Sequence, residues 1–157
     1  MIIFYTDGSC SANSATRNGG WAFKCSYKGK SVVKYGFKEE STNNEMELMA
    51  IYKAMRYAPI GEKYDQEITI FTDSRYCQQA LTRWARSWRA YGWTTSTGSK
   101  VKNQKLIEAM LKLMDKHLAY RVLNIEWVKG HSGIKGNEEV DKAANKARTE
   151  LITNWKK

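Results

Sequence analysis

The chain has 157 residues, of which 26 are Lys or Arg and 16 are Asp or Glu, so its formal net charge is +10 and its pI is near 9.5. With 42% hydrophobic residues, 12% aromatic residues and one proline, the composition excludes an intrinsically disordered or collagen-like chain. No apolar run approaches the roughly 18 residues of a membrane span, and no secretory leader is visible. We therefore expect one basic domain over residues 1–157, located in the cytoplasm and without a membrane partner.

The first half of the chain predicts three strands and a helix. Residues 2–7 form a β-rich run that ends at Asp7, and residues 20–27 and 31–37 form a hairpin around Lys28-Gly29-Lys30. Residues 8–20 are rich in Gly, Ser and Asn and predict a loop. Residues 44–58 carry apolar side chains at helical spacing, and Pro59 ends that helix.

The second half alternates helices with single strands. Residues 67–72 predict a fourth strand, and a helical stripe in one or two pieces follows from Ser74. Residues 106–118 predict another helix, residues 122–128 a fifth strand, and residues 137–148 a last helix. This order favours an α/β fold with one mixed sheet covered by helices.

Two aspartates stand where predicted strands end. Asp7 follows the first strand and Asp73 follows the fourth, so both carboxylates are expected at an edge of the sheet. Open α/β sheets tend to place ligand sites at such an edge. The alternative is that each aspartate caps a turn or the helix that follows it.

Helical periodicity separates the other candidate acids. Glu45 and Glu47 are roughly 200° apart around the predicted helix 44–58. Glu47 shares a face with Ile51 and Met55 and continues the core stripe, whereas Glu45 is expected in solvent. Asp141 lies at the margin of the apolar stripe of the last helix. Its alternative interpretation is a first-turn acid that the helix dipole favours.

Four converging carboxylates would repel one another unless cations lay between them. Mg²⁺ takes oxygen ligands, and two such ions can clamp the attacking and leaving oxygens of a phosphoryl transfer. If Asp7, Glu47, Asp73 and Asp141 meet, the sequence predicts a metal-dependent phosphodiesterase, although spacing does not by itself bring them together. His131, in the glycine-flanked loop 129–133, is a candidate proton shuttle.

Positive charge is concentrated between residues 74 and 107, a segment with seven basic residues and no acid. Trp84, Trp88, Tyr91 and Trp93 lie among these charges. Cations that contact phosphate together with aromatic rings that stack are typical of nucleic-acid binding. The alternative is a small satellite core with a solvated charged face.

Taken together, these motifs resemble those of the type 1 ribonucleases H in their compact bacterial and phage form. The matching strings are TDGSC (6–10), TNNEMELMA (42–50), TDSRY (72–76), GWTT (92–95), VKGHSG (128–133) and NEEVDKAA (137–144). The resemblance implies a mixed five-stranded sheet, three antiparallel strands first and then two more, with flanking helices and a basic helical protrusion. It also implies a monomer that hydrolyses the RNA strand of RNA/DNA hybrids with two Mg²⁺ or Mn²⁺ ions, leaving 5′-phosphate and 3′-hydroxyl ends.

The resemblance also implies roles for individual residues. Asp7, Glu47, Asp73 and Asp141 match the metal-binding carboxylates, and His131 matches a mobile histidine that assists proton transfer or product release. The positions that match contacts to the hybrid are Asn13, Thr42, Asn43, Asn44, Arg75, Arg83, Trp84, Arg86, Trp88, Arg89, Trp93, Lys100 and Lys102.

Two features depart from the family pattern. The loop 8–20 lacks the proline usual there, and Arg75 stands where bacterial relatives often carry Gln. We expect Arg75 to exchange a groove hydrogen bond for a phosphate contact. Two other interpretations stay open: a DNA-cutting relative on the same fold, and a hybrid-binding module without turnover.

Overall fold

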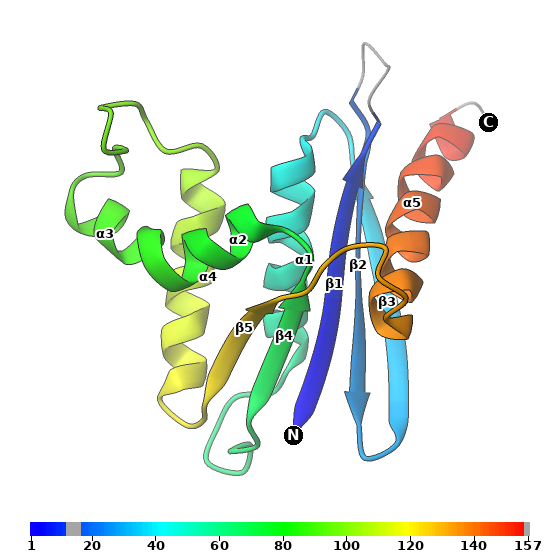
Figure 1. The fold of residues 1–157 in the computed structure, drawn as a ribbon, viewed down its shortest axis with the longest axis horizontal. Coiled ribbons are helices and arrows are strands. Elements are labelled where there is room, and N and C mark those ends of the chain that lie inside the picture. Colours follow the sequence, from blue (N-terminus) through cyan, green and yellow to red (C-terminus); the bar gives the residue numbers. More distant parts are fainter. Residues whose placement is uncertain (12–16, 156–157) are drawn as a thin grey trace.

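The computed structural model describes residues 1–11 and 17–155, which form one five-stranded sheet with helices on both faces (Figure 1). The strands lie in the order β3-β2-β1-β4-β5. β1, β2 and β3 pair in antiparallel fashion, whereas β4 runs parallel to β1 and β5 runs parallel to β4. This arrangement confirms the mixed sheet. The strand bounds are β1 (Ile2–Cys10), β2 (Gly19–Tyr27), β3 (Lys30–Lys38), β4 (Ile68–Thr72) and β5 (Leu123–Trp127).

Helices α1 and α5 cover opposite faces of the sheet. Two consecutive residues of β2 show this, because neighbouring side chains on a strand point to opposite faces. A Cβ added at Gly19 would contact the Met46 side chain of α1, and one at Gly20 would lie 2.2 Å from the Ala144 carbonyl oxygen of α5. The helical elements are α1 (Asn43–Tyr57), α2 (Arg75–Gln79), the π-helical turn η1 (Ala80–Trp84), α3 (Ala85–Ala90), α4 (Gln104–Leu118) and α5 (Lys135–Trp155).

The main core lies between the sheet and helices α1 and α4. Phe4 and Ile70 from the sheet, Ile51 from α1 and Met110 from α4 are completely buried there. His117 of α4 is also buried, and its Nε2 lies 2.8 Å from the Met55 carbonyl oxygen of α1, so this histidine is structural. No helix in the described part of the chain combines the length and the apolar character that crossing a bilayer requires.

Two elements, β1 and α5, extend beyond their predicted bounds, and the structure decides between one and two pieces for the helical stripe. β1 continues past Asp7 to Cys10, since residues 7–10 still pair with β2 after the pairing with β4 has ended at Thr6. The helical stripe after Ser74 is one uninterrupted run, 75–90, with a π-helical turn inside it. α5 begins at Lys135 rather than at Asn137 and reaches beyond the predicted end at residue 148.

Candidate metal centre and nucleic-acid interface

Three of the four predicted acids meet at one edge of the sheet. Asp7, Glu47 and Asp73 each place a carboxylate oxygen within 4.8 Å of the other two. The register of the parallel pair accounts for the two aspartates, because Thr6 of β1 pairs with Thr72, the last residue of β4, and an aspartate follows each threonine in the chain. We call these three residues, with Asp141 beside them, the carboxylate edge.

A glycine allows α1 to bring Glu47 to this edge. A Cβ at Gly8 would lie 2.2 Å from the carbonyl carbon of Met46, so a side chain there would push α1 away from β1. The Gly8 N–H donates directly to Oε1 of Glu47. Asn43, the first residue of α1, accepts the Cys10 N–H on its Oδ1 at 2.9 Å and fixes the same junction. Strand and helix are therefore locked together next to the two carboxylates.

Asp141 lies beside the cluster on the α5 side of the sheet. It is close enough to raise the pKa of Asp7 by its charge and by a side-chain hydrogen bond. It is the seventh residue of α5, and the first-turn acid of that helix is Glu138, which rules out the first-turn interpretation of Asp141. The structure thus brings all four predicted carboxylates into one neighbourhood, with three of them in closest contact.

Asn145 and Ser9 connect α5 to β1 beside Asp141, and no local sequence pattern indicates either contact. The Asn145 amide donates to the Asp141 carbonyl oxygen at 3.0 Å and lies 3.5 Å from its Oδ1. The Oδ1 of Asn145 accepts the Ser9 hydroxyl at 2.8 Å. One asparagine therefore ties Asp141 to the strand that carries Asp7.

Burial and mutual repulsion both disfavour ionised carboxylates here. Asp7 is 5% exposed and Glu47 is 8% exposed. Burial raises the pKa of both carboxyl groups, and the negative charge of Asp73 raises each pKa further. At Asp7, a hydrogen bond with Glu47 acts in the opposite direction and lowers the pKa. Within residues 1–11 and 17–149, no Lys or Arg forms an ion pair with these carboxylates. Buried oxygen donors without a protein cation fit a divalent metal ion.

Glu45, two residues before Glu47, lies apart from this cluster, as its helical position predicts. The expectation that it is simply solvated was wrong, because it is half-buried. Its carboxylate accepts from Lys38 Nζ at 2.6 Å and from the Ser41 hydroxyl at 2.7 Å. Glu45 thus has its own partners, which a helical wheel does not reveal.

His131 is exposed on the loop between β5 and α5 and has a positive φ of 54°. The preceding residue, Gly130, packs against the site, since a Cβ there would lie 2.9 Å from Oδ2 of Asp73. The loop therefore touches the carboxylate edge one residue before the histidine. Its exposure leaves the imidazole accessible to a bound substrate.

The predicted hybrid contacts at the start of α1 lie on the surface. Thr42, Asn43 and Asn44 are all exposed, and Thr42 caps the helix by accepting the Glu45 N–H on its hydroxyl. Asn13 falls within residues 12–16, outside the described residues. Arg75, at the start of α2, is exposed and lies over the indole ring of Trp127.

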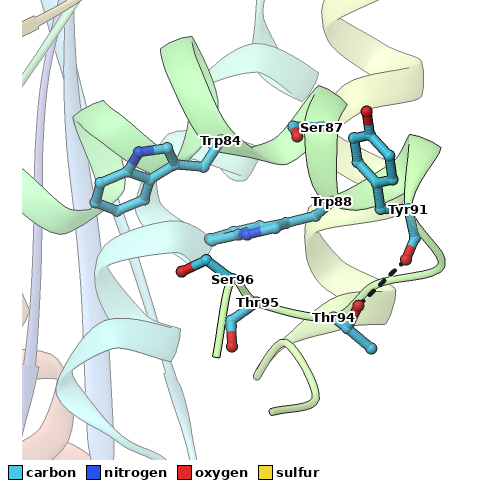
Figure 2. A pocket seen from close by; sticks show the side chains of 7 residues that line it. All are labelled: Trp84, Ser87, Trp88, Tyr91, Thr94, Thr95 and Ser96. Atoms are coloured by element: carbon cyan, nitrogen blue, oxygen red, sulfur yellow. Dashed lines mark hydrogen bonds between the residues drawn. The ribbon is translucent and has the colours of Figure 1, made fainter. Parts of the chain in front are cut away.

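The protrusion, residues 83–102, forms an open aromatic pocket (Figure 2). The rings of Trp84 and Trp88 have centroids 5.9 Å apart, and Trp84 remains 39% exposed. Trp88 and Trp93 are half-buried and pack against the main core. Trp88 and Trp93 therefore behave as the satellite-core interpretation predicts, whereas Trp84 keeps an exposed face. The pocket is lined by Trp84, Ser87, Trp88, Tyr91, Thr94, Thr95 and Ser96.

The basic residues of the protrusion differ in their partners. Arg83, Lys100 and Lys102 are exposed. Asp115 of α4 accepts from Arg86 at 2.8 Å and lies 3.8 Å from Arg89. These contacts with the two arginines, led by the hydrogen bond from Arg86, hold the pKa of Asp115 below its usual value. The segment contains no acid of its own, so this pairing could not be read from its sequence.

Comparison with known proteins agrees with this geometry. Residues 1–149 match the RNase H family. The chain is 42% identical over 153 residues to the ribonuclease H of Francisella tularensis subsp. novicida, covering 96% of this chain and 93% of that protein. LC9-RNase H1, described as a type 1 RNase H with the type 2 active-site motif, superposes with a TM-score of 0.78 at 26% identity, over 95% of this chain and 72% of that one.

A second solved structure, LC11-RNase H1 in complex with an RNA/DNA hybrid, shares the fold with a TM-score of 0.70 at 20% identity. That superposition covers 97% of this chain and 99% of LC11-RNase H1. The family match spans nearly all of the sequence, and the 42% identity is to a named ribonuclease H. This chain therefore belongs to the RNase H family, the metal-dependent enzymes that cut the RNA strand of RNA/DNA hybrids.

Proposed function

We propose that this chain cuts the RNA strand with two Mg²⁺ ions held by Asp7, Glu47, Asp73 and Asp141, with Mn²⁺ as an alternative metal. The observation that carries the proposal is the cluster of the Asp7, Glu47 and Asp73 carboxylates, two of them buried, with no protein cation paired to it among the described side chains. Bound Mg²⁺ would neutralise these carboxylates and stabilise the negative charge that develops on the oxygens of the phosphate under attack. The expected products have 5′-phosphate and 3′-hydroxyl ends.

The chain's own residues hold this arrangement in place before any substrate arrives. Asp7 and Asp73 are fixed by the paired strands, and Glu47 is fixed by the Gly8 N–H. Asn145 orients Asp141 through the backbone of α5. His131 takes up or delivers a proton on its imidazole during the reaction, which its exposure on the adjoining loop supports.

Hybrid binding is assigned to the surface between the start of α1 and the protrusion. The polar side chains of Thr42, Asn43 and Asn44 can contact a 2′-hydroxyl or a phosphate of the hybrid. Asn13 is assigned to hybrid binding as well, from its position in the sequence. Trp84 offers a stacking face next to the Trp88 ring, while Trp88 and Trp93 anchor the protrusion to the core. Phosphate contacts are assigned to Arg75, Arg83, Arg86, Arg89, Lys100 and Lys102. The presence of a hybrid in the complex of LC11-RNase H1 supports this assignment.

The test is cleavage of a labelled RNA/DNA hybrid with Mg²⁺ and with chelator, beside matched RNA/RNA and DNA/DNA duplexes. We expect metal-dependent loss of the hybrid's RNA strand alone. Cleavage of the DNA duplex would favour a DNA-cutting enzyme on this fold, and tight binding without product would favour a binding module. A single domain, a monomeric state and a cytoplasmic location stay predictions.

A further inference from the structure

Trp127 makes two contacts at the carboxylate edge that the proposed mechanism does not use. It is the last residue of β5 and pairs with Thr72, so its side chain lies next to the turn that carries Asp73. Its indole Nε1–H donates to the Asp73 carbonyl oxygen at 3.1 Å. On the ring face, the guanidinium carbon of Arg75 lies 3.9 Å from the centroid. One side chain thus touches both a carboxylate residue and a cation two positions further on.

The contact between Arg75 and Trp127 is a close stack. Other cations of this chain, among them Lys28 and Arg56, lie at 5.3 Å and 5.7 Å from their aromatic rings. A guanidinium stacked on a ring presents its π face to the indole and leaves the N–H donors at its edge free. Those donors suit a phosphate, which a guanidinium binds through two parallel hydrogen bonds.

Arg75 differs from the arginines of the protrusion in its partners. Arg86 and Arg89 share Asp115, whereas Arg75 forms no ion pair with any side chain in residues 1–11 and 17–149. It is exposed and belongs to the same turn as Asp73. A cation held beside four carboxylates by an aromatic ring rather than by an acid remains available to an anionic ligand.

We propose that Trp127 is a positioning residue with two separable effects: its indole N–H holds Asp73 for cleavage, and its ring face holds Arg75 for contact with a backbone phosphate of the hybrid. This inference rests on the proposed function. The ring face acts on substrate affinity and KM, while the hydrogen bond acts on kcat.

The two effects are separated by Trp127→Phe and Trp127→Leu. Both variants lose the N–H donor, and only Phe keeps an aromatic face, so any difference between them reports the stack with Arg75. We expect both to lower kcat by about tenfold, the scale of lost partners of metal ligands. We expect Trp127→Leu alone to weaken hybrid binding, by about threefold, the scale of an exposed cation–aromatic contact.

Arg75→Ala tests the phosphate contact directly. Anisotropy of a labelled hybrid in chelator measures binding without cleavage, over a series of KCl concentrations. Removal of one phosphate contact should weaken binding by about tenfold and reduce the slope of log K against log salt by about 1. Arg75→Lys, which keeps the charge, should keep the slope. Arg56→Ala is the matched control, since Arg56 is exposed, contacts the Tyr52 ring and lies at the far end of α1.

Thermal unfolding of each variant checks the fold, and Trp127→Met replaces Trp127→Leu if the latter unfolds. Equal binding by the Phe and Leu variants would overturn the role of the ring face. A parent-like kcat in Trp127→Phe would overturn the role of the hydrogen bond, and an unchanged salt slope in Arg75→Ala would overturn the phosphate contact. A parent protein that neither binds nor cuts the hybrid would instead contradict the proposed function itself.

Discussion

The carboxylate edge and the protrusion differ in how their charged groups are held. At the carboxylate edge, Asp7 and Glu47 are buried among like charges and fixed by paired strands and the Gly8 N–H. On the protrusion, the cations are exposed and their ion pairs are at the surface. Buried like charges in a fixed arrangement suit the binding of metal ions for chemistry, whereas exposed cations suit a long anion. We therefore expect substitutions at the carboxylate edge to change cleavage and substitutions on the protrusion to change substrate affinity.

The largest effect is expected from a substitution at the carboxylate edge that has a matched control on the same helix. Glu47→Gln should reduce cleavage on the order of a thousandfold, because it removes a metal ligand and leaves the fold intact. Glu45→Gln, two residues earlier, removes a carboxylate that contacts Lys38 and Ser41 instead. Turnover of a labelled hybrid by the two variants is the measurement. Equal losses would contradict the separation of the two glutamates.

Next in size is the effect of the protrusion on affinity. The triple variant Arg83→Ala, Arg86→Ala and Arg89→Ala should weaken hybrid binding about tenfold or more and reduce its salt slope by up to about 3. The cleavage rate at saturating hybrid should stay close to the parent's, because the carboxylates are untouched. Binding titrations at several salt concentrations, followed by turnover at saturation, test both statements. A collapse of turnover at saturation would show that the protrusion takes part in the chemistry.

A smaller effect is expected on the stability of the metal-free protein. The pKa of Asp7 is raised above its unfolded value of about 3.9. The folded state therefore favours the protonated carboxyl, and this stabilisation is lost as the pH rises from about 4 through the raised folded pKa. The side chain introduced by Asp7→Asn is neutral at every pH, so this variant avoids the cost of burying an ionised carboxylate at neutral pH. Its melting temperature there should rise by about 2–4 °C for each kcal/mol of added unfolding free energy.

Melting curves in chelator at neutral and mildly acidic pH measure this effect. The difference between Asp7→Asn and the parent should shrink as the pH falls. Glu62→Gln, at an exposed position, is the control and should melt like the parent. A variant that melted below the parent at neutral pH would show that the carboxylate stabilises the metal-free fold.

The smallest effect concerns the partner that the protrusion arginines share. Asp115→Asn removes the acid that pairs with Arg86 and Arg89, and should tighten hybrid binding about twofold at low salt, since exposed pairs are weak. The same titration as for the triple variant measures it. Weaker binding in Asp115→Asn would mean that the ion pairs hold the arginines in their binding geometry.

Local patterns indicated which acids could form the carboxylate edge, but not that these acids meet. Asp7 and Asp73 follow strand runs of similar length, and the helical period separated Glu47 from Glu45. The inference about the glutamates succeeded because a helix face is determined by residues near in sequence. Asp7, by contrast, lies inside β1 at the point where the pairing with β4 ends, which residues 2–7 alone do not indicate. The metal-binding roles of these residues stay predictions that the variants above test.

Contacts between distant segments could not be predicted in this way. Asn145 meets Ser9 across 136 positions, and Trp127 meets Asp73 across 54. The extension of β1 to Cys10 depends on its pairing with β2, which the composition of residues 8–10 does not indicate. Each of these features depends on side chains or strands that only the fold brings together.

The role of the carboxylate edge in cleavage is tested by measuring binding and cleavage on one sample of Asp73→Asn. A labelled hybrid is titrated with the variant in chelator, and Mg²⁺ is then added at saturating protein to follow a single turnover. We expect parent-like binding and no metal-dependent loss of the RNA strand. Cleavage at the parent's rate would contradict the assignment of the chemistry to the carboxylate edge.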